Sequence, residues 1–350
     1  MLFCCGGTAH EIMHARGEPA LVVPALRHAM RGNVLQYGRT FRKNGQAIRK
    51  LPQVVTRLAD ELTTYRPDLL ITDFEAFSPR AARRIGLPVL SFNHQQIITE
   101  TRYTLPASLR LQALVAMSVI KVIAPSKPEH LLLSSFFFPP LKHPSRTTLV
   151  PPIIRPAVQN LQPRQADHVL VYYNQPDESS HVLDQLRRID AEFIVYNFDP
   201  PGPAQTYPNL VFKQPSLDGF LADLASSKAV VCTAGFTLIS EALYLGKPLL
   251  VVPNRGIFEQ TLNALFLQRE NLGEAVLGRS LQRQDLSSFL SRCDRYAERL
   301  RNRPACGNKE AVACIEGVLS RLGPSLHTRP PLPYRPVATA SLTDAMAGSE

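Results

Sequence analysis

The sequence predicts an α/β protein with two doubly wound domains that face each other across a cleft. Short strands that are apolar throughout, such as DLLITD (68–73) and AVVCTA (229–234), alternate with amphipathic helical segments. Strands of this kind are typical of parallel sheets that helices cover on both faces. The same rhythm occurs twice, a Pro-rich stretch at 139–163 lies between the halves, and 350 residues suffice for two Rossmann-like domains.

In the first half, strands and helices alternate from about residue 47. Pro67 ends the first helix, and the helix SPRAARRIG has Pro79 in its first turn and Gly86 at its end. LLLSSFFFPP (131–140) is too short to span a bilayer and is interpreted as a buried strand and turn. The predicted elements of this half are helices at 47–66, 78–86 and 109–118 and strands at 68–73, 87–92 and 119–126.

The second half restarts with the strand HVLVYYN (168–174) and continues to a helical region at 284–321. Its further predicted strands are 191–198, 210–214, 229–234 and 248–253, and its further predicted helices are 180–189, 217–227, 237–246 and 258–273. These patterns predict a first α/β domain at 1–150, an extended linker at 151–165, a second α/β domain at 166–322 and a disordered tail at 323–350.

The net charge of +10 favours acidic partners. The basic residues are spread along the chain without a nucleic-acid-binding motif, so we interpret the excess as solvated surface and expect no nucleic-acid partner. Peripheral attraction to a membrane is the second interpretation. The six cysteines have no metal-binding spacing and indicate a reducing compartment, and no apolar run reaches 18 residues. We therefore expect a cytoplasmic protein, with a peripheral position at the inner membrane face as an extension.

The N-terminal segment GGTAH, at residues 6–10, could form a phosphate-binding loop with His10 as a catalytic base. A complete strand–helix–strand unit needs about 30 residues, and the stretch between Gly7 and Pro19 allows only about two helical turns. We expect these turns to be too few to cross a sheet. The expectation is that the first domain lacks its first strand–helix unit and that the phosphate loop lies elsewhere.

The most informative segment is 229–266, where a strand runs directly into Gly235 and a helix. Backbone N–H groups at that helix start, with the hydroxyls of Thr233 and Thr237, suit a diphosphate. Glu241, one turn into the helix, can accept both hydroxyls of a ribose. The pair Glu259–Gln260 follows the next strand and can bind several sugar hydroxyls. Each residue alone also has an ordinary structural interpretation as a turn, a solvated side chain or a helix start.

Taken together, this segment resembles the donor half of the GT-B glycosyltransferases. It is most similar to the UDP-glycosyltransferases and to the N-acetylglucosaminyltransferase that makes lipid II. The resemblance implies a diphosphate at the Gly-containing turn, a ribose on the glutamate and a sugar on the Glu–Gln pair. It also implies a loose match of the loop at Gln214 and Pro215 to the uracil-binding loop. The positions matched for the turn, the ribose and the sugar are Gly235, Phe236, Thr237, Glu241, Glu259, Gln260 and Asn263.

On the acceptor side, glycosyl transfer needs a base that deprotonates a hydroxyl. The segment PDLLITDFEAFSPRAARRIGLPVLSFNHQ resembles the acceptor domain of a bacterial and archaeal glycosyltransferase group, and the candidate bases in it are Asp73, Glu75 and His94. Asp73 could equally cap the helix that begins near Ser78, and His94 could be an ordinary loop residue. Asn174 and Gln175 end the first strand of the second domain and are candidate donor-side contacts.

The leading prediction is a hexosyltransferase that moves a sugar from a nucleotide donor, with UDP favoured, to a hydroxyl of a lipid-linked or cell-surface acceptor. The nucleotide sugar is a substrate, so no cofactor is expected, and no Asp-x-Asp metal motif ends a strand. Two alternatives stay open: a UDP-sugar 2-epimerase, and a non-catalytic nucleotide-sugar-binding protein.

Overall fold

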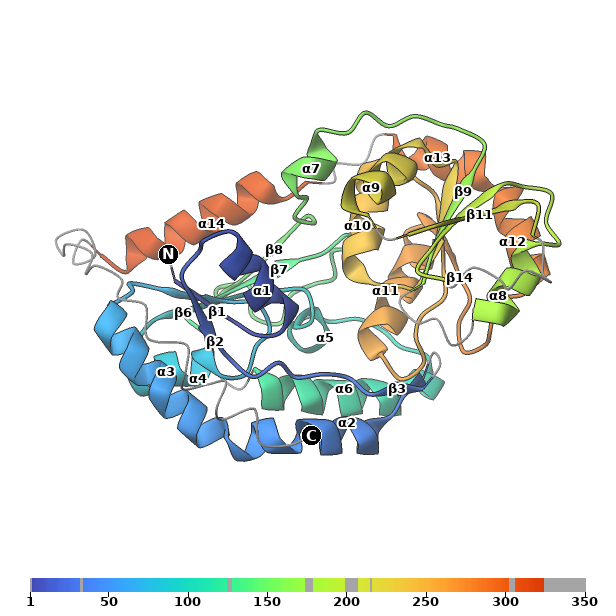
Figure 1. Cartoon of the computed structure of the whole chain (residues 1–350). Helices are drawn as coiled ribbons and strands as arrows, with labels where there is room; N and C mark the ends of the chain where they lie inside the picture. Colours follow the sequence, from blue (N-terminus) through green and yellow to red (C-terminus); the bar gives the residue numbers. More distant parts are fainter. Residues whose placement is uncertain are drawn as a thin grey trace.

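A computed structural model of the chain describes residues 2–31, 34–124, 128–173, 179–198, 207–214, 216–301 and 306–323. Blue-to-green elements and yellow-to-orange elements form two α/β halves (Figure 1). The main sheet of each half is parallel throughout. This arrangement confirms the predicted fold class.

The main sheet of the first half has four strands in the order β5-β6-β7-β8. The strands are Leu70–Thr72 (β5), Val89–Asn93 (β6), His130–Ser134 (β7) and Thr147–Val150 (β8). Strand β8 comes directly before Pro151 and was missed in the sequence because the prolines around it obscured a short apolar run.

Helices on the first half include one that replaces a predicted strand. Residues 119–126 were expected to be a strand, but Val119–Ile123 continue α6 (Arg110–Ile123). Only Ala113 and Ile120 of α6 are buried. The helix therefore contains more apolar residues than its buried face requires, and the continuous apolar run at its end has the sequence pattern of a buried strand. The other helical elements of the first half are α2 (Tyr37–Arg49), α3 (Leu51–Tyr65), α4 (Ser78–Arg84), α5 (Ile97–Glu100) and the short 3-10 helix η1 (Ala107–Leu109).

The first residues form a small strand–helix–strand unit of their own. Strand β1 (Phe3–Cys5) pairs in parallel with β2 (Ala20–Val22), and α1 (Thr8–Ala15) joins them. Eight helical residues therefore suffice to connect two adjacent parallel strands, which corrects the expectation that this segment is too short for a crossover.

The sheet of the second half has six strands in the order β11-β10-β9-β12-β13-β14. Numbered within the domain, this is the order 3-2-1-4-5-6 of dinucleotide-binding folds, whose ligand site lies where the order reverses, between β9 and β12. The strands are Val169–Tyr172 (β9), Phe193–Tyr196 (β10), Leu210–Lys213 (β11), Ala229–Cys232 (β12), Leu249–Val251 (β13) and Gly273–Ala275 (β14). The helices are α8 (Ser179–Leu186), α9 (Leu217–Ser226), α10 (Phe236–Tyr244), α11 (Phe258–Arg269), α12 (Arg283–Leu290) and α13 (Cys293–Leu300).

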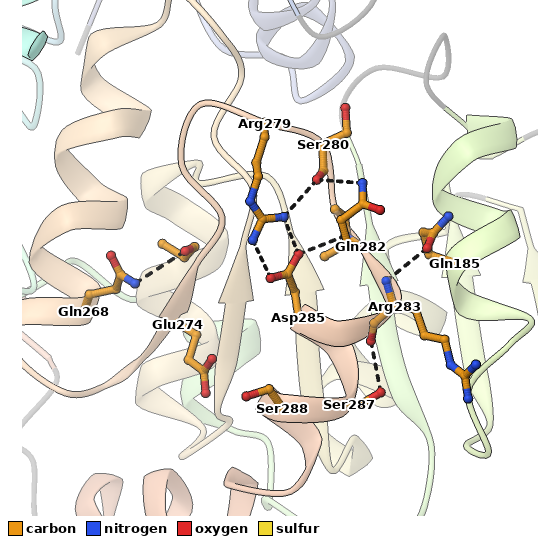
Figure 2. Close-up of polar contacts among 12 residues, drawn as sticks. Gln185, Gln268, Glu274, Arg279, Ser280, Gln282, Arg283, Asp285, Ser287 and Ser288 are labelled. Atoms are coloured by element: carbon orange, nitrogen blue, oxygen red, sulfur yellow. Dashed lines mark hydrogen bonds and ion pairs between the residues drawn. The ribbon is translucent and has the colours of Figure 1, made fainter.

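A polar network stabilises the turn into α12 (Figure 2). The guanidinium of Arg279 donates two hydrogen bonds of 2.6 Å to the carboxylate of Asp285, which also accepts from the backbone N–H of Gln282. The bond from Arg279 holds the pKa of Asp285 below its usual value. The backbone N–H of Arg283 donates to the side chain of Gln185 on α8, so this network joins two helices on one side of the sheet.

The last described helix, α14 (Asn308–Arg321), returns to the first half of the molecule (Figure 1). Its residues Ala311 and Val318 share a buried cluster with Leu90, Leu132 and Val150 of the first sheet. Packing therefore assigns α14 to the N-terminal half, whereas the sequence placed it in the donor domain ending at 322. The predicted tail lies outside the described residues from 324 onward.

The predicted linker is also more than an extended connection. It contains the short helix α7 (Pro156–Gln159), and its side chains Ile154 and Val158 are fully buried in the core that the two halves share. The segment is therefore anchored between the halves rather than exposed.

Candidate active site

A cavity of about 490 Å³ lies at the reversal point of the second sheet. Thr233 and Gly235 follow β12, Tyr172 ends β9, and Glu241 comes from α10. Five of the predicted donor-binding residues therefore lie together, although they were inferred from motif order alone. The cavity is lined by Arg155, Tyr172, Tyr196, Ser216, Phe220, Thr233, Gly235, Phe236, Thr237, Leu238 and Glu241.

Helix α10 starts at this cavity with Gly235 as its N-cap residue, and no side chain caps it. Its first backbone N–H groups lack partners within the helix and, together with the helix dipole, favour an anion. A Cβ atom at Gly235 would meet no protein atom within 4 Å, so packing does not require glycine here. The open space above Gly235 allows a ligand to approach the backbone closely.

Glu241 is held by an arginine that the sequence analysis missed. The Nε and Nη2 atoms of Arg155 donate to the two carboxylate oxygens of Glu241 at 2.7 and 2.9 Å. The Glu241 side chain is only 5% exposed, so Arg155 compensates a charge that is largely removed from water. Each carboxylate oxygen keeps a second lone pair for a ligand hydroxyl. No local pattern in the linker distinguished Arg155, because its partner lies 86 residues further along the chain.

Aromatic side chains form the other wall of this cavity. Phe220 contacts the rings of Tyr172 and Tyr196 edge to face, at centroid distances of 5.3 and 5.2 Å. The hydroxyl of Tyr196 donates to Asp223 at 2.6 Å, and burial together with this bond raises the pKa of Tyr196. Both tyrosines occupy the last position of a central strand, which is the only sequence signal that could have identified them.

The predicted sugar-binding residues do not line the cavity. Gln260 is buried, and its side-chain oxygen accepts from the backbone N–H of Asn254 at 2.8 Å. Glu259 is half-buried at the start of α11, and its charge acts on Asp73 of the first domain. Glu259 therefore faces the acceptor side of the molecule.

Asn263 and His94 connect the two halves. The Nε2 atom of His94 lies 2.8 Å from Oδ1 of Asn263, and its Nδ1 atom lies 2.8 Å from the carbonyl oxygen of Ser134. The imidazole also stacks on Phe236 at a centroid distance of 3.8 Å. With both ring nitrogens in contact with oxygen atoms and the residue only 4% exposed, His94 is an interdomain contact in this structure. Its geometry does not support the predicted role as a base.

Asp73 and Glu75 have different environments although only Phe74 separates them in the sequence. The carboxylate of Glu75 accepts from the backbone N–H of Phe77 at 2.7 Å and from the hydroxyl of Ser78 at 2.5 Å. Glu75 therefore caps the start of α4, a role that the sequence analysis considered for Asp73. Asp73 is exposed at the end of β5, and partial loss of water and then the charge of Glu259 raise its pKa.

The backbone between these acids is unusual, because Phe74 has a φ angle of 46°. A large L-residue in this region carries strain that the surrounding structure must offset, and such positions concentrate at functional sites. The strained residue separates the exposed carboxylate from the capping one.

Several predicted contacts are not placed. Asn174, Gln175 and Pro215 lie outside the described residues. Gln214 is exposed directly after β11 and does not line the cavity. Within the described part of the chain, no group of three His, Cys, Asp or Glu side chains could hold a metal ion.

Two parallel α/β domains, with an anion-binding helix start and a buried carboxylate at the reversal point of the second, define a GT-B glycosyltransferase. Residues 19–294 match the sequence model of glycosyl transferase family 1, and the chain belongs to this family. It is a glycosyltransferase that depends on a nucleotide-sugar donor. No curated protein matches the sequence.

Solved structures share the fold at low sequence identity. The kitacinnamycin glycotransferase superposes with a TM-score of 0.62 at 14% identity, covering 92% of this chain and 91% of that one. Phytolacca americana UGT2, complexed with UDP-2-fluoro-glucose and pterostilbene, has a TM-score of 0.62 at 14% identity, covering 91% and 98%. Acinetobacter baumannii MurG has a TM-score of 0.57 at 14% identity, covering 91% and 90%.

Proposed function

We propose that this glycosyltransferase takes its sugar from a UDP-linked donor and passes it to a hydroxyl of a lipid-linked or cell-surface glycan. The observation that carries the donor side is the cavity at the reversal point, which combines the start of α10 with the buried carboxylate of Glu241. Phytolacca americana UGT2, which shares this fold, was solved with a UDP-sugar analogue, and this supports UDP as the donor nucleotide.

In this proposal, the donor residues divide the nucleotide sugar among them. The first N–H groups of α10 and the hydroxyls of Thr233 and Thr237 bind the diphosphate, and Glu241 accepts from the ribose hydroxyls. The flat rings of Tyr172 and Phe220 suit the nucleobase of the donor. Glu259 and Gln260 act on the sugar, which requires Gln260 to exchange its bond to Asn254 for a donor hydroxyl.

Asp73 is the candidate base. It removes the proton from the acceptor hydroxyl as that oxygen bonds to the anomeric carbon and the bond from this carbon to the diphosphate breaks. UDP leaves with the bonding electrons, and the amides at the start of α10 stabilise the charge that develops on it. Transfer by this route needs neither a cofactor nor a bound metal ion.

We further propose a cytoplasmic protein with peripheral contact at the inner membrane face. The support is compositional: a net charge of +10 favours anionic surfaces. No helix among the described residues is long and apolar enough to cross a bilayer.

Calorimetry with UDP, UDP-glucose and UDP-GlcNAc, followed by a donor-hydrolysis assay, tests the donor proposal. Glu241→Ala should abolish measurable UDP binding, whereas Glu259→Ala should retain UDP binding and weaken binding of the sugar nucleotide. Glu298→Ala on the exposed face of α13 is the matched control and should bind as the unaltered chain does. Binding without turnover would favour a non-catalytic binding protein, and no nucleotide binding would overturn the proposal.

A further inference from the structure

The excess of positive charge comes from two stretches of the first half. Residues 19–59 contain eight Lys and Arg residues and no Asp or Glu, and residues 101–128 contain four and again no acid. Of the 39 Lys and Arg residues of the chain, these twelve lie here, and the remaining 27 are slightly outnumbered by the 29 Asp and Glu residues. Basic residues therefore occur throughout the chain, but the net charge of +10 does not.

Helix α6 lies in the second of these stretches and has an apolar outer face. Ala113 and Ile120 point to the core, and the helical period places Leu111, Val115 and Val122 on the opposite side. Leu111 is 74% exposed and Val122 is 68% exposed. A surface helix ordinarily presents charged or polar side chains there. The exposed large apolar residues of α6 are Leu111, Leu114, Val115, Val119 and Val122.

The inner face of α6 is well packed, so its apolar outer face does not result from a loosely held helix. Ala113 and Ile120 belong to the main buried cluster that both halves share. The guanidinium of Arg80 on α4 donates to the carbonyl oxygens of Val122 and Ile123 at the end of α6, the latter at 3.1 Å. These contacts fix the helix with its apolar outer face toward solvent.

Helix α2 lies in the first stretch and combines apolar and cationic side chains on its exposed surface. All thirteen of its residues are described, and none is buried. Thr40 and Asn44 bond to the backbone of residues 27–29, so they face inward. Phe41 is 71% exposed and Ile48 is 47% exposed, and their spacing of about two turns places both on one face. The basic residues of α2 are Arg39, Arg42, Lys43 and Arg49.

The two helices lie on the same side of the molecule, below the first sheet in the view of Figure 1. Ala47 of α2 and Ile123 of α6 pack against the same buried cluster around α3. We call the exposed residues of these two helices the α2–α6 face. It is apolar and cationic, and neither helix contributes an acid to it.

We propose that the α2–α6 face docks on an anionic lipid bilayer, which gives the peripheral membrane contact proposed above a defined surface. Phe41, Leu111 and Val122 enter the boundary between headgroups and acyl chains, and the basic side chains bind the anionic headgroups. This inference rests on the proposed membrane contact and not on the identity of the sugar donor.

A second copy of the chain fits this face less well than a bilayer does. Two copies that met by the same face would bring their positive charges together, because residues 19–59 and 101–128 contain no acid to offset them. An anionic bilayer satisfies both properties of the face, since it offers negative headgroups outside and an apolar interior beneath them.

Vesicle flotation of the full chain tests this proposal. Vesicles of phosphatidylcholine and phosphatidylglycerol in equal parts are compared with vesicles of phosphatidylcholine alone. The chain should bind the anionic vesicles about tenfold more tightly or better, and added salt should release it because salt screens the charges. Equal binding to both kinds of vesicle, or binding to neither, would overturn the proposal.

A pair of substitutions on α6 tests the apolar part of the face. Leu111→Ser with Val122→Ser removes its two most exposed apolar side chains, and binding to anionic vesicles should fall by about tenfold or more. The matched control is Val211→Ser with Val312→Ser, because each of these valines is 53% exposed on another element, β11 or α14. The control should bind as the unaltered chain does, and an equal loss in both pairs would contradict a defined face.

A second pair tests the charged part of the face on α2. Arg42→Gln with Lys43→Gln removes two attractions to the headgroups and should weaken binding to anionic vesicles by about tenfold. Arg295→Gln with Arg299→Gln changes the net charge equally on the exposed surface of α13 and should have little effect. If both pairs weaken binding equally, the overall charge rather than the α2–α6 face attracts the chain, and the proposal fails.

The donor site and the oligomeric state are measured separately, without vesicles. Calorimetry with UDP reports that each variant is folded, and absence of UDP binding by the unaltered chain would overturn the donor proposal without altering the vesicle result. Sedimentation equilibrium detects a second copy. A dimer that Leu111→Ser with Val122→Ser dissociates would assign the face to a partner chain and overturn the bilayer proposal.

Discussion

At the residue scale, the two acids that follow β5 show how environment separates two similar side chains. Glu75 accepts hydrogen bonds from the start of α4, whereas Asp73 remains free of such bonds in the contacts that the structure describes and faces Glu259. A base must offer an unprotonated oxygen to the acceptor. Asp73 is therefore the better candidate of the two.

The raised pKa of Asp73 predicts the pH dependence of the reaction. The base works when it is deprotonated, so kcat should fall on the acid side at a pH above the usual aspartate value of 3.8. Removing the negative charge of Glu259 lowers the pKa of Asp73, so Glu259→Gln should move this acid limb to lower pH. Asp73→Asn should reduce kcat by roughly 100- to 10,000-fold. Profiles of kcat against pH decide this, and an acid limb that Glu259→Gln leaves in place would count against it.

Arg155 matters for the donor site because it pairs with the buried carboxylate of Glu241. Arg155→Ala leaves the buried Glu241 carboxylate without its two charged hydrogen bonds, which should weaken UDP binding by about tenfold or more. The UDP affinity of Arg155→Lys should lie between those of the unaltered chain and Arg155→Ala, because a lysine keeps the charge and loses the paired hydrogen-bond geometry. Calorimetry with UDP measures both, and an unchanged dissociation constant for Arg155→Ala would contradict a role for this ion pair in the donor site.

At the scale of elements, the start of α4 depends on Glu75. Replacing a residue that caps a helix start costs about 0.5–2 kcal/mol, so Glu75→Ala should lower the free energy of unfolding by that amount. Its kcat should change little. Asp73→Asn is the matched control with the opposite expectation, a large loss of kcat and little loss of stability. Urea unfolding and initial rates measure the pair, and a loss of kcat by Glu75→Ala comparable to that of Asp73→Asn would reverse the assignment.

The helices and strands were mostly predictable where the apolar pattern of a segment and the residues that flank it indicate the same element. Every predicted strand of the second half forms, because each is a short apolar run, and all but the edge strand β11, where Val211 is 53% exposed, are largely buried. The errors in the first half include two segments where these signals conflict. Four of the five residues of Val119–Ile123 are β-branched and apolar, yet the segment extends α6. Thr147–Val150 form β8 although prolines follow directly.

At the scale of the whole molecule, the halves are joined at several points. The backbone N–H of Leu35 donates to Arg255 at 2.9 Å, and the hydroxyl of Tyr37 donates to the carbonyl of Gly256 at 2.9 Å. Gly256 has a φ angle of 84°, and a Cβ there would lie 3.0 Å from the side chain of Leu35. A glycine is therefore required for this close approach. The hairpin of β3 (Met30–Arg31) and β4 (Val34–Leu35) thus reaches across to the donor domain.

The contact between His94 and Asn263 predicts coupling between the halves. His94→Ala and Asn263→Ala should each destabilise the chain, and together they should cost less than the sum, with a coupling energy of about 0.5–3 kcal/mol. The acid limb of kcat against pH should keep its position in His94→Ala, because Asp73 sets it. Unfolding of the four chains of this cycle gives the coupling, and additive effects would argue against a direct contact. Loss of the acid limb in His94→Ala would restore His94 as the base.

The α/β class and the order of the donor-site residues could be predicted from the sequence, because parallel strands, helix starts and turn glycines have local signatures. The partners of those residues could not, because they depend on contacts between distant parts of the chain. Arg155 meets Glu241, His94 meets Asn263, and α14 returns to the first sheet through contacts between distant parts of the chain.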